Sequence, residues 1–276
     1  MKKANQKIID RWNKHASPES EWEHYKPDSP GRFEDTEIVS KNPERAFPLA
    51  MRPLLKKYIG DLHGKKVLVP SSGDNKAVFG FHLLGAKVTS CDIAENQLKN
   101  AKTLADKYNW DIEFICQDSM ELDKIKDGEY DLVYTSNGVH VWIDDMPSMY
   151  KNFYRVLKPG GYNIFFETHP VIRPFGWDNK DFKMKKLYED IEPHGDDLTY
   201  DWRTQDFVNA IASAGFTIKE MQEFHSAEGD LDDYLPQEKN PEHENYGIDM
   251  KDYTQNPWAA LPQCLCLCSQ KGGQTL

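Results

Sequence analysis

The stretch KKVLVPSSGDNKAVF, residues 65–79, decides the fold. It joins a short apolar strand to an apolar helix through a turn, which is how a nucleotide-binding βαβ unit begins. Turns in that position usually carry several glycines, because the backbone must approach a ligand closely. Here Gly73 is the only glycine of the turn, and Ser71, Ser72 and Asn75 stand around it. We therefore expect a ligand that side-chain hydroxyls can help to hold.

The same alternation of strand and helix continues along the chain. Strands are predicted at residues 65–69, 87–91, 112–116, 130–136, 162–169, 216–224 and 263–271, and helices at 75–84, 95–108, 145–157 and 204–215. Strands that alternate with helices of this length indicate a doubly wound, mostly parallel sheet with both faces covered. A polar, short-helical connection is expected between the third and fourth strands. No crossover helix is evident between the last two strands, which predicts an antiparallel C-terminal pair at the sheet edge. The fold class is therefore α/β.

Residues 1–63 lack strand character and are predicted to form a helical cap or lid that precedes the ligand-binding domain at 64–276. Helices are expected at 5–15 and 44–62, where apolar residues recur at helical spacing. Between them, residues 17–33 are rich in Pro, Ser and charge, and they are expected to form a loop.

Two stretches, residues 170–200 and 225–262, interrupt the domain with little periodicity. Long loops of this kind are often lids or binding loops, and flexible surface insertions account for them equally well. Aromatic residues are dense where a lid would lie: Trp12, Trp22, Tyr25, Phe175, Trp177, Tyr200, Trp202 and Trp258. A cage of aromatic rings can hold a cationic amine or a flat phenol.

The composition excludes several classes of protein. With 39% hydrophobic and 29% charged residues, the 276-residue chain can bury a sizeable core and is not globally disordered. A net charge of −11 without a Lys/Arg run makes nucleic acid a poor partner. No apolar run approaches the length that spans a bilayer. We therefore expect no nucleic-acid partner and no membrane partner.

The chain has 5 cysteines, an odd number, and begins without a secretory segment, so a reducing cytoplasm is expected. Three of the cysteines form the stretch CLCLC at residues 264–268. A period of two places their sulfurs on one face of a strand, whereas structural zinc pairs have C-x2-C or longer spacing. We predict buried thiols there and no metal site.

Polar residues gather at the predicted carboxyl ends of the strands, where ligands bind in open α/β sheets. Asp92 ends the second strand, 19 residues after Gly73, where an acidic side chain can accept both ribose hydroxyls of an adenosine ligand. Asp118 follows the third strand, where it can accept from an adenine amino group. Each carboxylate can instead cap the helix or turn that follows it.

These motifs, in this order, resemble those of class I S-adenosylmethionine-dependent methyltransferases of the methyltransferase domain 11/25 type, in a bacterial small-molecule branch. The resemblance covers residues 65–161 and extends loosely to ALPQCLCLCSQK at 260–271. The first loop of the family falls on residues 69–75, its ribose-binding acid on Asp92, and its fourth motif on YDLVYTSNGVHVW at 130–142.

The resemblance implies a Rossmann-like fold, S-adenosylmethionine as the cofactor and a small-molecule methyl acceptor. The cofactor contacts that it implies are Pro70, Ser71, Ser72, Gly73, Asn75, Asp92, Ile93, Asp118, Ser119, Met120 and Asn137. S-adenosylmethionine has no phosphate that needs bare backbone N–H groups, so the loop tolerates the loss of glycines. Asn75 stands at the third glycine of the family, and asparagine tolerates a left-handed backbone.

Methyl transfer is an in-line displacement in which the protein mainly supplies alignment and a dry pocket. A base is needed only where the acceptor arrives protonated. The candidate catalytic residues are His140, after the fourth strand, and His169, after the fifth, because both imidazoles follow strand ends. Alternatively, His140 packs beside Trp142, and His169 belongs to a turn before Pro170.

Two other functions remain open on the sequence. The chain can be a non-catalytic binding or scaffold protein that retains the fold, because Val69 and Ser71 depart from the loop of the family. An NAD-dependent oxidoreductase shares the sheet and Asp92, but it needs glycines at positions 71 and 76, where Ser and Lys stand.

Overall fold

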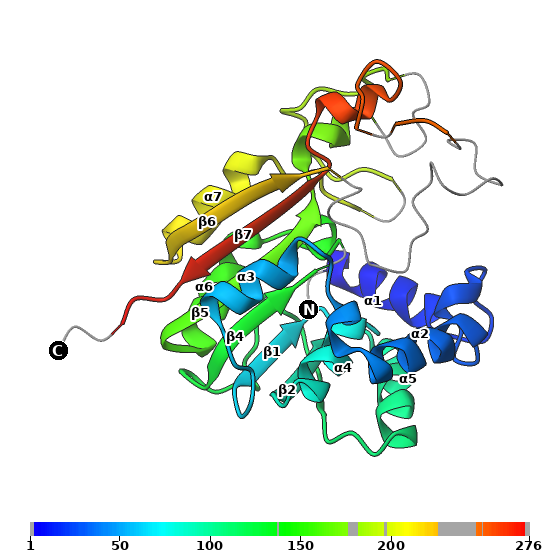
Figure 1. Cartoon of the computed structure of the whole chain (residues 1–276), viewed down its shortest axis with the longest axis vertical. Helices are drawn as coiled ribbons and strands as arrows, with labels where there is room; N and C mark the ends of the chain where they lie inside the picture. The colour runs from blue at the N-terminus through cyan, green and yellow to red at the C-terminus, as the bar shows by residue number, and fades with distance from the viewer. Residues whose placement is uncertain are drawn as a thin grey trace.

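The computed structural model describes residues 3–136, 138–175, 182–195, 198–225, 247–249 and 251–273. These residues build a 7-stranded sheet with the order β3-β2-β1-β4-β5-β7-β6 (Figure 1). The strands are β1 (Lys66–Pro70), β2 (Lys87–Asp92), β3 (Glu113–Cys116), β4 (Tyr130–Thr135), β5 (Leu157–Thr168), β6 (Thr217–Phe224) and β7 (Cys264–Gln270). Strands β1 to β5 pair in parallel, and β7 runs antiparallel to its neighbours β5 and β6. The predicted α/β class, with a mostly parallel sheet and an antiparallel C-terminal pair, is confirmed.

Helices cover both faces of the sheet. Helices α3 (Met51–Tyr58), α4 (Lys76–Leu83) and α5 (Glu95–Lys107) pack on one face, and α6 (Met146–Val156) and α7 (Thr204–Ser213) pack on the other. Alternate side chains of β1 enter the two halves of the core: Val67 and Val69 the first, Leu68 the second. Because β1 is buried on both faces, it appears in the sequence as a continuous apolar run.

The connection between β3 and β4 consists of turns, so the predicted short helix is wrong. Leu122 and Ile125 reach from this connection into the second half of the core, with exposed fractions of 0% and 4%. These two side chains cover the sheet where a crossover helix would otherwise pack. Polar residues separate the two in the sequence, so no apolar pattern indicates that this connection contributes to the core.

The N-terminal residues form helices beside the first βαβ units. Helices α1 (Lys3–His15) and α2 (Pro30–Lys41) lie against α5 and α4, respectively (Figure 1). Side-chain amides join α1 to α5, because the Asn96 N–H donates to Asn13 Oδ1 at 2.9 Å and the Asn100 amide donates to the Ala16 carbonyl at 2.9 Å. The division between a cap and a domain at residues 63 and 64 stays a prediction.

Helix α2 corrects the sequence interpretation. The loop predicted at residues 17–33 is wrong at its C-terminal end, because α2 begins at Pro30. Proline at the first helical position is compatible with a helix, since its missing N–H has no helical partner there. The helix predicted at 44–62 consists of η2 (Pro43–Ala46) followed by α3.

The described residues of the two insertions contain little regular structure. The first contains η4 (Pro170–Phe175) and an antiparallel bridge between His194 and Thr199. The second contains η6 (Pro257–Ala260), and its residues 226–246 and 250 lie outside the described residues.

The prediction of buried thiols in β7 is confirmed for two of its three cysteines, whereas Cys264 at the start of the strand is only half-buried. Cys266 and Cys268 are fully buried in the first half of the core, and Cys266 Sγ lies 2.9 Å from the Met51 sulfur. Burial raises the pKa of the Cys268 thiol to about 12, so the reactive thiolate is scarce at neutral pH. In the part of the chain that the structure describes, no His, Cys, Asp and Glu side chains gather as a group that could hold a metal ion. No helix among the described residues is both long and apolar enough to cross a membrane.

A close helix contact gives a test of the fold. A Cβ at Gly80 of α4 would lie 2.4 Å from the Ala46 Cβ and 3.0 Å from the Pro43 carbonyl oxygen. Gly to Ala in a helix normally stabilises by about 1 kcal/mol. We expect Gly80→Ala instead to lower the free energy of unfolding by about 1–3 kcal/mol, because η2 must shift. Urea denaturation measures the change.

The matched control is Gly31→Ala in α2, where the nearest atom to a Cβ is Ser29 Oγ at 3.9 Å. This substitution should be neutral or stabilising. Equal effects of the two substitutions would contradict the close packing of η2 on α4.

Candidate functional site

A cavity lies at the carboxyl ends of the central strands, and we call it the strand-end cavity. Its floor and sides come from four loops that follow β1, β2, β3 and β4. The lining residues of these loops and of the helical turns that follow them are Ser71, Ser72, Gly73, Asp74, Asn75, Lys76, Asp92, Ile93, Gln97, Asp118, Ser119, Met120, Ser136, Gly138, Val139, Trp142 and Ile143. Of the predicted cofactor residues, Pro70 ends β1 and is absent from the lining, and Asn137 lies outside the described residues.

The first loop holds its shape with two left-handed residues. Gly73 has a φ of 51°, and Ser71 has a φ of 48°, a conformation that costs a side-chain-bearing residue about 1 kcal/mol or more. The Ser71 hydroxyl bonds the Ser119 hydroxyl from the loop after β3. Ser72 points inward, where its hydroxyl bonds the Ser90 hydroxyl at 2.8 Å. The two serines therefore stabilise the conformation of the loop and also line the cavity.

Asn75 acts differently from the prediction. The left-handed backbone expected there is wrong, because Asn75 has φ −57° and ψ 123°. It caps α4, with its side-chain oxygen accepting the Ala77 N–H at 2.9 Å. Its amide also donates to the Ser136 hydroxyl at 2.8 Å and so joins the loops after β1 and β4.

Asp92 links the loop after β1 to the start of α5. Its Oδ2 accepts the Gly73 N–H at 2.8 Å, and its Oδ1 accepts the Ala94 N–H at 2.8 Å. The side chain is 8% exposed and lines the cavity. Burial raises the pKa of Asp92 to about 6, against the opposing effect of these N–H donors and with help from the nearby Asp74 charge. The carboxylate therefore caps a turn, as one of the two sequence interpretations expects, and it also lines the cavity.

The part of the strand-end cavity that is formed by residues after β2 and β3 contains both apolar and polar groups. Ile93 and Met120 line it together with Asp118, whose Oδ1 accepts the Met120 N–H at 2.8 Å. Gln97 of α5 is 2% exposed and lines the same cavity, and its Oε1 has no hydrogen-bond partner within the described residues. A buried acceptor of this kind needs a partner, which a ligand can supply.

The N-terminal residues, which the sequence analysis predicted to form a cap or lid, also line the cavity. The N-terminal residues that line it are Ile8 and Trp12 of α1, His24 and Tyr25 of η1 (Glu23–Tyr25), and Arg32, Asp35 and Thr36 of α2. The apolar face of the predicted first helix was a usable signal for Ile8 and Trp12. No sequence signal pointed to α2, because its apolar residues lack helical periodicity.

Two ion pairs hold α2 to the first loop and to α4. Arg32 is 4% exposed, and its guanidinium lies 3.3 Å from the Asp74 carboxylate. Lys76 lies 3.0 Å from Asp35, in a more exposed pair. Burial lowers the pKa of Arg32, against the opposing effect of the Asp74 charge. The Arg32 pair therefore ties the N-terminal wall directly to the residue beside Gly73.

Trp12 contacts two other aromatic rings that line the cavity. The Trp12 ring lies edge-on to Tyr25 at 5.6 Å and edge-on to Trp142 at 5.1 Å, measured between ring centroids. Of the other aromatics that the sequence analysis grouped with Trp12 and Tyr25, Trp22 contacts the Tyr25 ring at 5.7 Å. Trp258 packs against Phe175, Tyr200 stacks on Trp202, and Trp177 lies outside the described residues.

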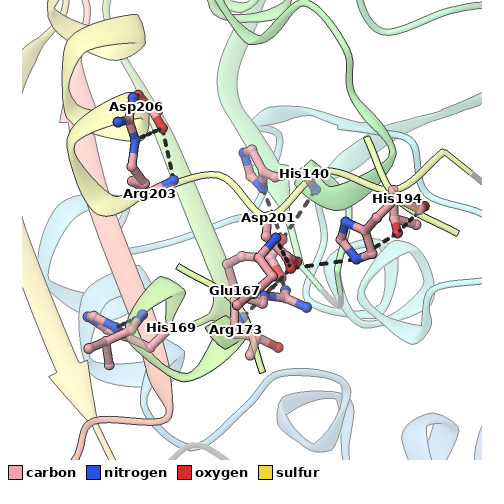
Figure 2. Close-up of polar contacts among 12 residues, drawn as sticks. His140, Glu167, His169, Arg173, His194, Asp201, Arg203 and Asp206 are labelled. Atoms are coloured by element: carbon pink, nitrogen blue, oxygen red, sulfur yellow. Dashed lines mark hydrogen bonds and ion pairs between the residues drawn. The ribbon is translucent and has the colours of Figure 1, made fainter. Parts of the chain in front are cut away.

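The two predicted catalytic histidines do not line the strand-end cavity. His140 is 1% exposed, and its Nδ1 lies 3.1 Å from Glu167 Oε2 (Figure 2). Its Nε2 lies 2.8 Å from the Tyr150 hydroxyl. His169 bonds Glu223 through Nε2 at 2.7 Å, and burial lowers its pKa against the opposing effect of that carboxylate. Both rings are engaged in packing contacts of the fold.

Parts of the chain are similar in sequence to known proteins. Residues 70–165 match the Methyltransf_11 family, described as a methyltransferase domain. A curated demethylmenaquinone methyltransferase of Lactococcus lactis subsp. lactis is 33% identical over 121 residues, which are 42% of this chain and 47% of that protein. A ubiquinone biosynthesis O-methyltransferase of Bordetella pertussis is 31% identical over 133 residues, covering 46% of this chain and 54% of that protein. The chain thus spans about half the length of these curated relatives.

Solved structures share the fold. An S-adenosylmethionine-dependent methyltransferase from Mesorhizobium loti superposes with a TM-score of 0.59 at 20% identity, covering 80% of this chain and 98% of that one. Geranyl diphosphate C-methyltransferase from Streptomyces coelicolor A3(2) superposes with a TM-score of 0.62 at 11% identity, covering 98% and 99%. At these identities the likeness concerns the fold alone.

The buried ion pair predicts a difference between two neighbouring carboxylates. Asp74→Asn leaves the Arg32 guanidinium buried without a counter-charge, so we expect the free energy of unfolding to fall by about 3 kcal/mol. Asp35→Asn, the matched control on the more exposed pair, should cost about 1 kcal/mol or less. Urea denaturation of both variants gives the comparison, and equal losses would show that the Arg32 pair is not special.

Proposed function

We propose that this chain, whose residues 70–165 form a methyltransferase domain of the Methyltransf_11 family, transfers the methyl group of S-adenosylmethionine to a small-molecule acceptor. The observation that carries the proposal is the Asp92 carboxylate, which faces the strand-end cavity at the carboxyl end of β2 while it holds the Gly73 N–H. This is the place at which open α/β sheets bind the ribose of a nucleoside.

The residues present fit the nucleoside part of the cofactor. Each Asp92 oxygen accepts one main-chain N–H and keeps a lone pair for a ribose hydroxyl. Ile93 and Met120 offer apolar contact to an adenine ring, and Asp118 can accept from its amino group. The unpaired Gln97 Oε1 supplies a further acceptor.

The first loop fits the amino-acid part. Left-handed Ser71 and Gly73 turn the backbone sharply at the cavity, and the Ser71 hydroxyl stands beside Ser119. S-adenosylmethionine carries no phosphate, so a loop with one glycine can hold it through hydroxyls and main-chain groups. The departures from the family loop are therefore compatible with binding of S-adenosylmethionine.

The chemistry supplied by the bound cofactor is a methyl group on a positively charged sulfur, open to attack by a nucleophile. The residues of this chain align the acceptor with that methyl group and exclude water. We assign the acceptor to the side of the cavity lined by Trp12, Tyr25 and Trp142. The N-terminal residues then serve as the lid.

An acceptor that arrives protonated needs a base, and the strand-end cavity offers one. Among the described residues that line it, His24 is the only imidazole. In that same part of the chain no hydrogen bond engages the His24 ring, which contacts Tyr25 edge-on at 5.4 Å. His140 and His169 carry no step in this proposal, because their rings bond Glu167 and Glu223 outside the cavity.

The binding test compares two aspartates that both accept an N–H two residues ahead. We expect Asp92→Ala to weaken S-adenosylhomocysteine binding by about tenfold to a few hundredfold in calorimetric titration, because charge-assisted bonds to the ribose are lost. The variant should also melt earlier, since Asp92 supports Gly73 and Ala94. Asp61→Ala, which removes an acceptor of the His63 N–H away from the cavity, should leave affinity unchanged.

The same titration separates the alternative functions. Binding of S-adenosylhomocysteine without binding of NAD supports the methyltransferase. Binding of NAD alone would favour the oxidoreductase, and binding of neither would favour a scaffold that retains the fold. Unchanged affinity in Asp92→Ala would remove the ribose assignment.

Binding should also depend on pH through Asp92. With a pKa of about 6 in the ligand-free protein, its carboxyl is largely protonated at pH 5. Ribose hydroxyls donate to the ionised form, so binding below pH 6 must first release a proton. We expect the affinity for S-adenosylhomocysteine to fall roughly fivefold to tenfold from pH 7 to pH 5. The α-amino and α-carboxyl groups of the ligand keep their charge over most of this range. A pH-independent affinity in wild type would contradict the assignment, and Asp92→Asn should flatten the profile.

A further inference from the structure

The turn η3 (His140–Trp142), with its flanking residues, separates two cavities. Val139, Trp142 and Ile143 line the strand-end cavity. His140 and Val141 point the opposite way and line a small second cavity, together with Glu167, Arg173, Tyr200 and Trp202. One turn therefore carries a wall of the strand-end cavity on its front and a polar cluster on its back.

Hydrogen bonds from three segments hold the back of this turn. Glu167 at the end of β5 accepts the His140 N–H at 3.2 Å and bonds the ring at 3.1 Å. The Tyr200 N–H donates to the Val141 carbonyl at 2.8 Å, and the Trp202 indole N–H donates to the Ile143 carbonyl at 3.0 Å. Tyr150 of α6 bonds His140 from the third side. These bonds reach main-chain groups along the turn and so fix its orientation.

Buried charges anchor the segment that makes two of those bonds. Asp201 lies between Tyr200 and Trp202 and is 10% exposed, with Lys186 Nζ at 3.0 Å, His194 Nε2 at 3.5 Å and Arg173 Nε at 3.9 Å (Figure 2). Arg173 also lies 3.5 Å from Glu167 Oε1, so one guanidinium joins the two carboxylates. The cluster thereby connects the first insertion to β5 behind the turn.

The front of the turn places Trp142 against the N-terminal wall. Its ring meets Trp12 edge-on at 5.1 Å, and the Arg11 guanidinium lies 5.3 Å from its centroid. Burying an ion pair seldom adds net stability over apolar packing, and in some proteins its effect is to fix a geometry. The geometry fixed here is the position of the Trp142 ring at the strand-end cavity.

We propose that Glu167 and Asp201 are positioning residues for the acceptor wall, the part of the strand-end cavity lined by Trp12, Tyr25 and Trp142: they hold the back of η3 so that the Trp142 ring stays in edge-on contact with Trp12. Naming this wall the acceptor wall rests on the proposed function. The structural link between the buried carboxylates and Trp142 does not, and the experiment measures that link first. The inference gives the first insertion a role at the cavity although its described residues do not line it.

Two indoles in edge-on contact couple their transitions and produce an exciton couplet in circular dichroism. We expect wild type to show the couplet of this pair, and both Trp142→Phe and Trp12→Phe to lose it. We expect Glu167→Gln and Asp201→Asn, each of which keeps every tryptophan, to reduce it to less than half. Their affinity for S-adenosylhomocysteine should stay within about threefold of wild type, because the Asp92 loop is untouched.

The matched control is Asp206→Asn, which removes the ion pair with Arg203 at 2.8 Å in the same region without touching η3 (Figure 2). It should keep the full couplet even if its melting temperature falls. An unchanged couplet in folded Asp201→Asn, or an equal loss in Asp206→Asn, would overturn the proposal. If Glu167→Gln does not fold, Asp201→Asn decides the outcome alone. Failure of wild type to bind S-adenosylhomocysteine would refute the proposed function and leave the couplet result standing.

Discussion

The hydrogen bond from the Gly73 N–H to the Asp92 carboxylate, at 2.8 Å, joins the two loops on which the cavity depends. It can form because β1 and β2 pair in parallel with Pro70 opposite Cys91, so the residues that follow both strands emerge side by side. A parallel sheet produces this proximity at every pair of neighbouring strand ends. The ligand side of the molecule is thus a direct consequence of strand direction and register.

That constraint explains why the sequence predicted many of the residues that line the cavity. Strands buried on both faces appear as apolar runs, and the polar residue after each run falls at the same edge of the sheet. Asp92 and Asp118 were identified in this way, Ile93 and Met120 were implied by the family resemblance, and all four line the cavity. The strand order β3-β2-β1-β4-β5 then follows from the usual winding of such units.

The parts that the sequence did not predict depend on contacts between distant segments. Arg32 enters the site only because α2 packs on α4 and meets Asp74, and nothing near Arg32 in the sequence marks that partner. His140 follows a strand as a catalytic residue would, yet a turn of 3-10 helix directs its ring to Glu167. A strand end fixes where the backbone emerges, but the turn that follows fixes which side chain faces the ligand.

Strand β7 has a consequence for how the molecule folds. It occupies the position between β5 and β6, so β6 has no place in the sheet until the chain has passed from Phe224 to Cys264 and returned. Closing such a long loop costs chain entropy before any pairing rewards it, which makes this region slow to form. Until then β5 presents an open edge with buried-type side chains, a template for pairing with other chains. The two halves of the sheet therefore differ in kinetic vulnerability, and aggregation during refolding should begin at the β5 edge.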